Sequence, residues 1–300
     1  MEKLTVWLST HKITALLIIA FLLILAGGSF ALAKFNPKPQ VALEEVDLPF
    51  EAEGPYALTF PRRDGNALVL NLKRTGSYDA ISFELAYTSK SDETTVAGNK
   101  ISSDGEGNSA TGAIDRGVVG NIDTKEKKGE YEQEILFGTC SKNVCKYDKG
   151  VENGTLTLHI KKGDKAYKMS TQWHIQKPDV SLGVLASGDG HFTYKVNAER
   201  ESLTNVGFSI VNDLTGAPKL PDGNSVLGKV YALNVPVAKS LSPGDLSFEL
   251  ADKPASEAKI FRYSDSENKW QELDTKINGS KLTAKAPGAG IFAVLAANKK

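Results

Sequence analysis

An excess of charge of either sign is absent from this sequence. Lysine and arginine together number 36, aspartate and glutamate also number 36, and the formal net charge is zero. Proteins that bind nucleic acids or acidic surfaces carry a concentrated field of basic side chains. We therefore expect no nucleic acid among the partners of this protein.

Catalytic motifs are also missing. The chain contains no H-E-x-x-H, no G-x-S-x-G, no Walker-type glycine loop and no H-x-E followed by C-x-x-C. These patterns mark zinc proteases, serine hydrolases, nucleotide-binding enzymes and zinc deaminases. Carboxylates are abundant, but their positions in the sequence select no pair for acid–base catalysis. We expect no catalytic residues, no cofactor and no metal site, and we expect the protein not to be an enzyme.

Cysteine occurs only twice, as Cys140 and Cys145 in the stretch FGTCSKNVCKYDKG at 137–150. A zinc site needs four closely spaced ligands, and a thioredoxin-type pair has two intervening residues at a helix start. Here four residues separate the cysteines, between extended segments that can place them opposite each other across a hairpin. We expect a structural disulfide between them; free thiols, or a metal or redox pair, are the alternatives.

A helical apolar stripe of ten or more residues is absent beyond residue 40. Apolar residues instead occupy every second position, which is typical of a strand with one buried and one wet face. The run EYEQEI at 130–135 also alternates, with its three glutamates on one face. The predicted fold class is all-β, and the clearest strands are expected at 67–72, 81–87, 130–135, 155–160 and 167–175.

Long apolar runs are rare, with one exception near the N-terminus. Ile13 to Ala33 is 21 residues without a charged side chain, and a helix of that length spans roughly 30 Å of hydrocarbon. We expect a transmembrane helix or a signal peptide at 13–33, with the lipid bilayer as its partner. A retained anchor is favoured, but Ala31-Leu32-Ala33 after Gly27-Gly28 resembles a cleavage site, so secretion after cleavage following Ala33 is the alternative.

The flanks of this run suggest its orientation. Residues 1–12 form a short tail with Lys3 and Lys12, and are expected to be cytoplasmic; residues 34–40 contain Pro37 and Pro39, and are expected to form an extended stalk. The predicted location is the cell membrane, with a single pass and the C-terminal bulk outside the cytoplasm. Thiols at this spacing are expected to oxidise there.

The alternating part of the chain is expected to form two β-sandwich domains, 41–177 and 178–300, divided by a proline-containing break at 176–179. The Gly- and Ser-rich stretch 102–120 is expected to be a long surface loop or a poorly ordered strand edge. Tight turns are predicted at Asp64-Gly65, Thr75-Gly76, Asn153-Gly154, Gly163-Asp164 and Asn278-Gly279. Strands of the second domain are expected around 190–198, 206–212, 225–235, 258–263, 269–273, 281–286 and 290–296.

The last part of the chain contains KIFRY at 259–263, WQEL at 270–273 and GIFAVL at 290–295. This order of strand, turn, tryptophan, strand and glycine resembles the closing strands of Ig-like modules in exported microbial surface proteins. The resemblance covers about 40 residues. It implies an Ig-like sandwich for the second domain and implies no activity.

Trp173 and Trp270 are tryptophans that could contact a ligand, because aromatic faces bind sugar rings on many β-sandwiches. Trp173 alternates in phase with Tyr167, Met169 and Ile175, which predicts a core position. Trp270 follows the polar turn 264–269 and is the one candidate ligand-contact residue, although packing is the simpler interpretation.

Other candidate sites are weaker. His159 and His174 lie on the polar phases of strands, and we expect no metal role for them or for His191. DGEGNS at 104–109 has alternate oxygen ligands but lacks the glycine of a calcium loop, so a solvated loop is expected. Asn153-Gly154-Thr155 and Asn278-Gly279-Ser280 match the glycan acceptor pattern, but Asn-Gly also favours turns.

The sequence therefore favours an exported surface protein with a structural, adhesive or partner-binding role, possessing loops that contact a surface protein or a glycan. A carbohydrate-binding surface module that uses Trp270 is the first alternative. An exported hydrolase of an unrecognised type is the second, and it would require a concave polar pocket.

Overall fold

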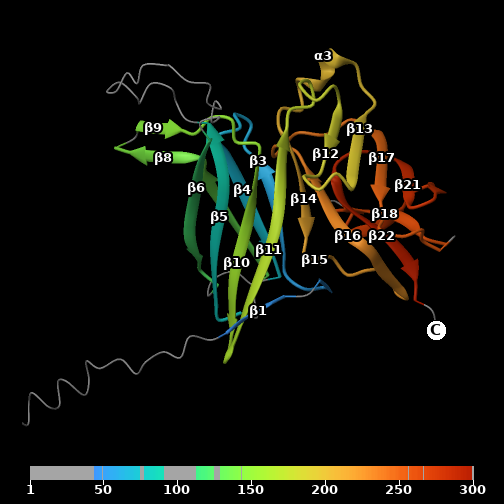
Figure 1. The fold of residues 1–300 in the computed structure, drawn as a ribbon, viewed down its shortest axis with the longest axis horizontal. Helices are drawn as coiled ribbons and strands as arrows, with labels where there is room; N and C mark the ends of the chain where they lie inside the picture. Colours follow the sequence, from blue (N-terminus) through green and yellow to red (C-terminus); the bar gives the residue numbers. More distant parts are fainter. Residues whose placement is uncertain are drawn as a thin grey trace, which may run out of the picture. The chain divides into compact units, whose positions relative to one another are not determined.

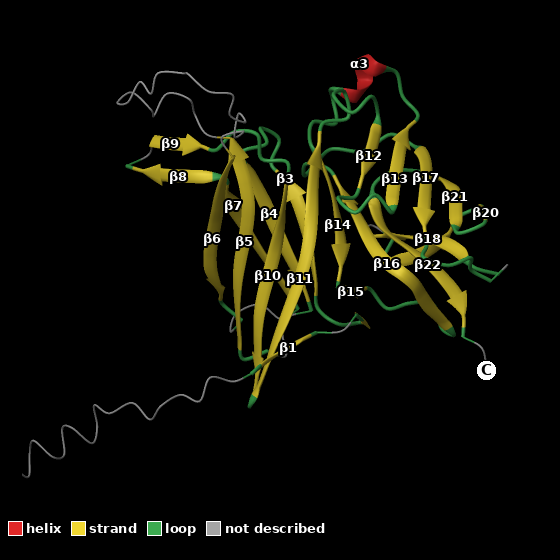
Figure 2. Cartoon of the chain, viewed as in Figure 1, coloured by secondary structure: helices red, strands yellow, loops and turns green. Residues whose placement is uncertain are grey.

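The computed structural model describes residues 44–48, 50–74, 78–90, 113–124, 129–142, 144–255, 257–265 and 267–298. In these ranges the chain forms β-strands almost throughout, and a single turn of helix, α3 (Arg200–Leu203), is the exception (Figure 2). The predicted all-β class is confirmed. No helix within these ranges has the length and apolar character needed to cross a membrane. The predicted cytoplasmic tail 1–12, membrane segment 13–33 and stalk 34–40 lie outside the described residues.

One large antiparallel sheet runs through both halves of the chain (Figure 1). Its edge strand β6 (Ala113–Ile122) overlaps the end of the stretch 102–120 predicted as a loop or a poorly ordered strand edge, and residues 102–112 lie outside the described residues. A short parallel strand, β1 (Glu45–Asp47), pairs with the beginning of β11. From one edge to the other the order is β19 (Lys269–Glu272), β18 (Lys259–Ser264), β22 (Gly290–Ala297), β16 (Asn224–Asn234), β14 (Ser209–Leu214), β11 (Lys165–Gln176), β10 (Asn153–Lys162), β5 (Ala80–Lys90) and β6.

The link between the halves is the pairing of β11 with β14, from Trp173 opposite Asn212 to Gln176 opposite Ser209. The predicted boundary at 177/178 falls directly after β11. Strands on either side of that boundary are therefore hydrogen-bonded neighbours in one sheet. The division into separate folding domains stays a prediction.

A three-stranded sheet covers one face of the large sheet over its N-terminal strands. It consists of β3 (Tyr56–Pro61), β4 (Ala67–Lys73) and β7 (Glu130–Leu136). The core between these two layers excludes water almost completely and contains leucines of β4 together with Phe83, Phe137 and Trp173. Trp173 is 2 % exposed, so its predicted core position is confirmed. The glutamates of β7 face outward, also as predicted.

A five-stranded sheet covers the opposite face over the C-terminal strands. Ile210 of β14 belongs to the first core, whereas its neighbour Val211 belongs to a second core with Phe192 and Phe292. Since successive side chains of a strand point to opposite faces, the two cores lie on opposite sides of the shared sheet. The order of the covering sheet is β12 (Val184–Ala186), β13 (Phe192–Val196), β17 (Gly244–Glu249), β21 (Lys281–Ala286) and β20 (Thr275–Asn278).

Strand β3 is an edge strand whose free carbonyls are satisfied by side chains of the large sheet. Asn212 Nδ2 donates to Ala57 O at 3.0 Å, and Asn234 Nδ2 donates to Thr59 O at 3.0 Å. Both asparagines are buried. Buried carbonyls without partners are costly, so these amides allow the three-stranded sheet to extend over the C-terminal strands.

The turn predictions have mixed outcomes. Gly65, Gly163 and Gly279 have positive φ in tight turns as predicted, while Thr75-Gly76 lies outside the described residues. The turn predicted at Asn153-Gly154 is wrong, because both residues pair with β11 at the start of β10. Gly154 serves packing: a Cβ there would stand 2.3 Å from Ala86 O and 2.5 Å from the Trp173 ring.

The disulfide between Cys140 and Cys145 is confirmed. The two residues are opposite each other in the hairpin of β8 (Gly138–Ser141) and β9 (Val144–Tyr147), with Cα atoms 4.0 Å apart. Both cysteines are exposed. A further short pair, β2 (Glu51–Ala52) with β15 (Gly216–Ala217), connects the N-terminal chain to the loop after β14.

A polar cluster joins the turn between β12 and β13 to strands β14 and β16. The Asp189 carboxylate accepts from Ser187 Oγ at 2.6 Å and Tyr231 OH at 2.9 Å, and pairs with Lys229 Nζ at 3.0 Å. Lys229 also pairs with Asp213 at 3.3 Å. Burial works to raise the pKa of Asp189, but these hydrogen bonds outweigh it and hold that pKa at about 2.

The cluster predicts an acid-sensitive contribution to stability. Because the pKa of Asp189 is lower in the folded chain than its ordinary value of 3.8, its contribution is present above about pH 4 and is lost as the pH falls towards 2. We expect Asp189→Asn to lower the denaturant midpoint at pH 6, and the difference from the parent chain to shrink towards pH 2. The control is Asp222→Asn, whose side chain is 97 % exposed. A difference for Asp189→Asn that is constant from pH 6 to 2 would contradict the prediction.

Candidate functional site

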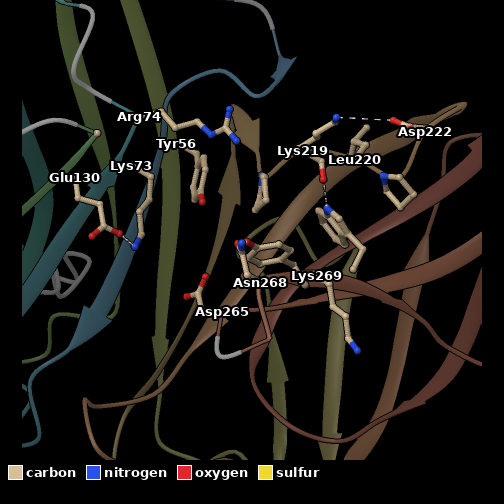
Figure 3. A pocket seen from close by; sticks show the side chains of 15 residues that line it. Tyr56, Lys73, Arg74, Glu130, Lys219, Leu220, Asp222, Asp265, Asn268 and Lys269 are labelled. Atoms are coloured by element: carbon tan, nitrogen blue, oxygen red, sulfur yellow. Dashed lines mark hydrogen bonds and ion pairs between the residues drawn. The ribbon is translucent and has the colours of Figure 1, made fainter.

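A groove of about 1030 Å³ lies where the end of the three-stranded sheet meets the C-terminal strands of the large sheet (Figure 3). Three separate parts of the chain line it. The first is a row of paired residues, Tyr56, Lys73 and Glu130, on β3, β4 and β7. The second is the segment 218–222 after β15, and the third is the hairpin of β18 and β19.

Trp270 lies in this groove and its ring is fixed from two sides. Its Nε1 donates to Lys219 O at 2.9 Å, a hydrogen bond drawn as a dashed line beside the label of Lys219 in Figure 3. The indole also meets the Tyr263 ring edge-on, with centroids 5.5 Å apart. Trp270 is half-buried and packs at the border of the core formed by Tyr56, Tyr263 and their neighbours. It is therefore both a packing residue and a wall of the groove.

Three polar groups beside Trp270 keep hydrogen-bonding capacity. The Asp265 carboxylate makes no ion pair or hydrogen bond with any described residue, and the Tyr56 hydroxyl likewise has no partner there. Tyr263 OH donates to Asn268 Oδ1, and the two Nδ2 hydrogens of Asn268 have no acceptor among the described residues. Figure 3 shows these side chains around one end of the groove.

The tyrosine at the base of the groove stays protonated. Burial raises the pKa of Tyr56 far above its usual range, and the neighbouring Asp265 carboxylate raises it further. Burial and Asp265 raise the pKa of Tyr263 in the same way. Both hydroxyls are therefore hydrogen-bond donors throughout the physiological range of pH.

The charges around the groove are mostly paired. Lys73 pairs with Glu130, Lys219 with Asp222 at 3.9 Å, and Arg74 donates to Glu53 O at 3.0 Å. Four cations and three carboxylates line the groove, a net of one positive charge: Lys73, Arg74, Lys219 and Lys269 against Glu130, Asp222 and Asp265. Such a balance creates no concentrated field of either sign.

The other candidate residues lie elsewhere. His159 Nδ1 contacts the Glu45 carboxylate at 2.8 Å, His191 Nδ1 contacts Glu249 O at 3.1 Å, and His174 is half-buried. Among the described residues no group of three or more His, Cys, Asp or Glu side chains could hold a metal ion. The calcium-like stretch 104–109 lies outside those residues.

Sequence reasoning found Trp270 and missed its neighbours. Asp265 and Asn268 belong to the polar turn that precedes Trp270, and proximity in the sequence could have suggested them. Tyr56 and Lys219 carry no such signal, because they are 214 and 51 residues from Trp270 along the chain. No protein-family model matches this chain, and no curated protein matches its sequence.

Proposed function

We propose that this protein is a membrane-anchored recognition protein that holds a preformed groove outside the cytoplasm. In this proposal residues 13–33 are a single-pass anchor, the two sandwich halves are Ig-like, and the groove contacts a surface protein or a glycan. The observation that carries the proposal is the groove itself, with a fixed half-buried tryptophan beside three uncommitted polar groups. Ligand sites combine such apolar walls with a few convergent polar groups.

The number of carboxylates without a partner in the groove favours ligand recognition over hydrolysis. The groove is concave and polar, as the hydrolase alternative requires. However, glycoside hydrolysis by the common mechanisms uses two carboxyl groups on either side of the bond. Of the three carboxylates that line the groove, Glu130 and Asp222 are paired with lysines, whereas Asp265 has no ion-pair or hydrogen-bond partner among the described residues.

The proposal is tested on the full-length chain in intact cells. We expect the protein to stay with membranes after an alkaline wash, and its C-terminal bulk to be cut by protease added outside. Full-length protein in the cytosol, with Cys140 and Cys145 both alkylated by a thiol reagent, would overturn it. Release of a chain that begins at Lys34 would replace the anchor with the secreted alternative.

Binding is tested separately with the detergent-solubilised full-length protein as bait for envelope extracts. We expect capture of an envelope component by the parent chain and weaker capture by Trp270→Ala. Equal capture by both chains, or capture by neither, would remove the groove from the proposal.

A further inference from the structure

We propose that the groove binds an uncharged carbohydrate chain, with the Trp270 ring against a sugar face and Asp265, Asn268 and Tyr56 bonded to sugar hydroxyls. This inference rests on the proposed function, because it names the class of ligand that the groove recognises. It draws on four observations: the state of the Trp270 ring, the uncommitted polar groups, the paired charges and the size of the groove.

The Trp270 ring presents an apolar face and no donor. Its single N–H group is already used by Lys219 O, and Tyr263 meets the ring edge-on. Two contacts from different elements therefore fix the orientation of the ring before a ligand arrives. The C–H face of a pyranose is the complement of such a surface, and a fixed ring loses little conformational entropy on binding.

The uncommitted polar groups match hydroxyls rather than charged groups. An ionised carboxylate accepts several hydrogen bonds, a primary amide nitrogen donates two, and a phenol can donate and accept. Asp265, Asn268 and Tyr56 all line the groove, and together they supply this mixture. Neighbouring sugar hydroxyls each offer one donor and one acceptor function, so they can satisfy all three groups.

The charge pattern disfavours an acidic polymer. The four cations that line the groove are each paired with a carboxylate: Lys73 with Glu130, Arg74 with Glu53, Lys219 with Asp222 and Lys269 with Glu267. A ligand carboxylate or sulfate would compete with the paired carboxylates for these cations, and it would face Asp265, which has no ion-pair partner among the described residues. Like charges at close range oppose binding, whereas uncharged hydroxyls meet no such penalty.

The size of the groove points to several sugar units. Pockets for compact small molecules measure about 300–1,000 Å³, and this groove, at about 1030 Å³, is slightly larger than that range. The three elements that line it leave it open to solvent, so a chain can enter and leave it. We therefore expect an oligosaccharide or a polysaccharide segment rather than a free monosaccharide.

The experiment is affinity electrophoresis of the detergent-solubilised full-length protein in gels that contain one polysaccharide each. The uncharged probes are a β-glucan, a galactomannan and an arabinoxylan, and the acidic probe is alginate. We expect at least one uncharged probe to retard the protein more strongly than alginate. Stronger retardation by alginate, or no retardation by any uncharged probe, would overturn the inference.

Two variants assign the binding to the groove. We expect Trp270→Ala and Asp265→Asn each to weaken binding about tenfold or more, because each removes a central contact. Trp270→Phe keeps an aromatic face and should bind more tightly than Trp270→Ala. Asp265 is exposed, so Asp265→Asn is informative even where Trp270→Ala disturbs the fold. Lys195→Ala, on the five-stranded sheet, is the control outside the groove and should bind like the parent chain.

The outcomes separate this inference from the proposed function. Retardation that both groove variants leave unchanged would overturn the inference. Groove-dependent capture of an envelope protein, without retardation by any uncharged polysaccharide, would also overturn it and leave the recognition function in place. A cytosolic full-length chain with reduced cysteines would overturn both.

Discussion

Replacing Trp173 with alanine is expected to lower the free energy of unfolding by about 3–5 kcal/mol. The side chain is 2 % exposed and stacks on Phe137 with ring centroids 5.7 Å apart. The ring also packs against the backbone of Gly154. The cavity left by the indole would be enclosed by strands of two sheets, which limits how far the surroundings can collapse. Denaturant titration of the full-length chain, followed by circular dichroism, measures the loss.

The matched control is Trp270→Ala, which removes the same side chain from a half-buried position in the groove. Because less apolar surface is buried there, the loss should be clearly smaller than for Trp173→Ala. Equal losses at the two positions, or a loss below about 1.5 kcal/mol at Trp173, would contradict the assignment of Trp173 to the closed core.

Gly154→Val is expected to lower the free energy of unfolding by about 3 kcal/mol, at the upper end of the range for overpacking. The added Cβ would stand 2.3 Å from Ala86 O, a backbone atom that belongs to the β5 ladder and cannot move freely. It would also stand 2.5 Å from the Trp173 ring. The measurement is the same denaturant titration.

Gly117→Val is the control for this substitution. Gly117 is also in a strand, the edge strand β6, but a Cβ there would meet nothing within 4 Å. Since valine favours strands, this change should be neutral or slightly stabilising. In a Trp173→Ala background the cost of Gly154→Val should fall, because one of its two clashes is gone. If Gly154→Val and Gly117→Val changed the free energy of unfolding equally, position 154 would have space for a side chain that these distances exclude.

The local features of the fold could be predicted from the sequence. The alternation at 155–160 and 167–175 predicted strands with one buried face, and β10 and β11 have that pattern. The spacing of Cys140 and Cys145 predicted the disulfide. These features depend on residues close in the sequence. The turn prediction at Asn153-Gly154 was wrong because it considered only residues close in the sequence. Gly154 is needed there because the Trp173 ring packs against its backbone, which is a contact across strands.

The alternation of apolar and polar residues could not predict that both halves of the chain share one sheet. A period of two shows which side chains share a face, but it does not show which strand is the neighbour. The signal that was available is the apolar run IFAVL at 291–295, where every residue is buried. Such runs are typical of strands covered on both faces. The candidate site was only partly predictable, since Tyr56, Lys219 and Trp270 meet through the stacking of sheets from distant parts of the chain.

The side chains of β14, β16 and β22 alternate between cores on opposite faces of the large sheet, which restricts how this protein can change during evolution. Ile210 and Val211 are adjacent in the chain but contribute to opposite cores. Deleting or inserting one residue within such a strand would exchange the side chains of both cores at once. Variation in length is therefore expected to accumulate in the connections between strands, while these three strands keep their length.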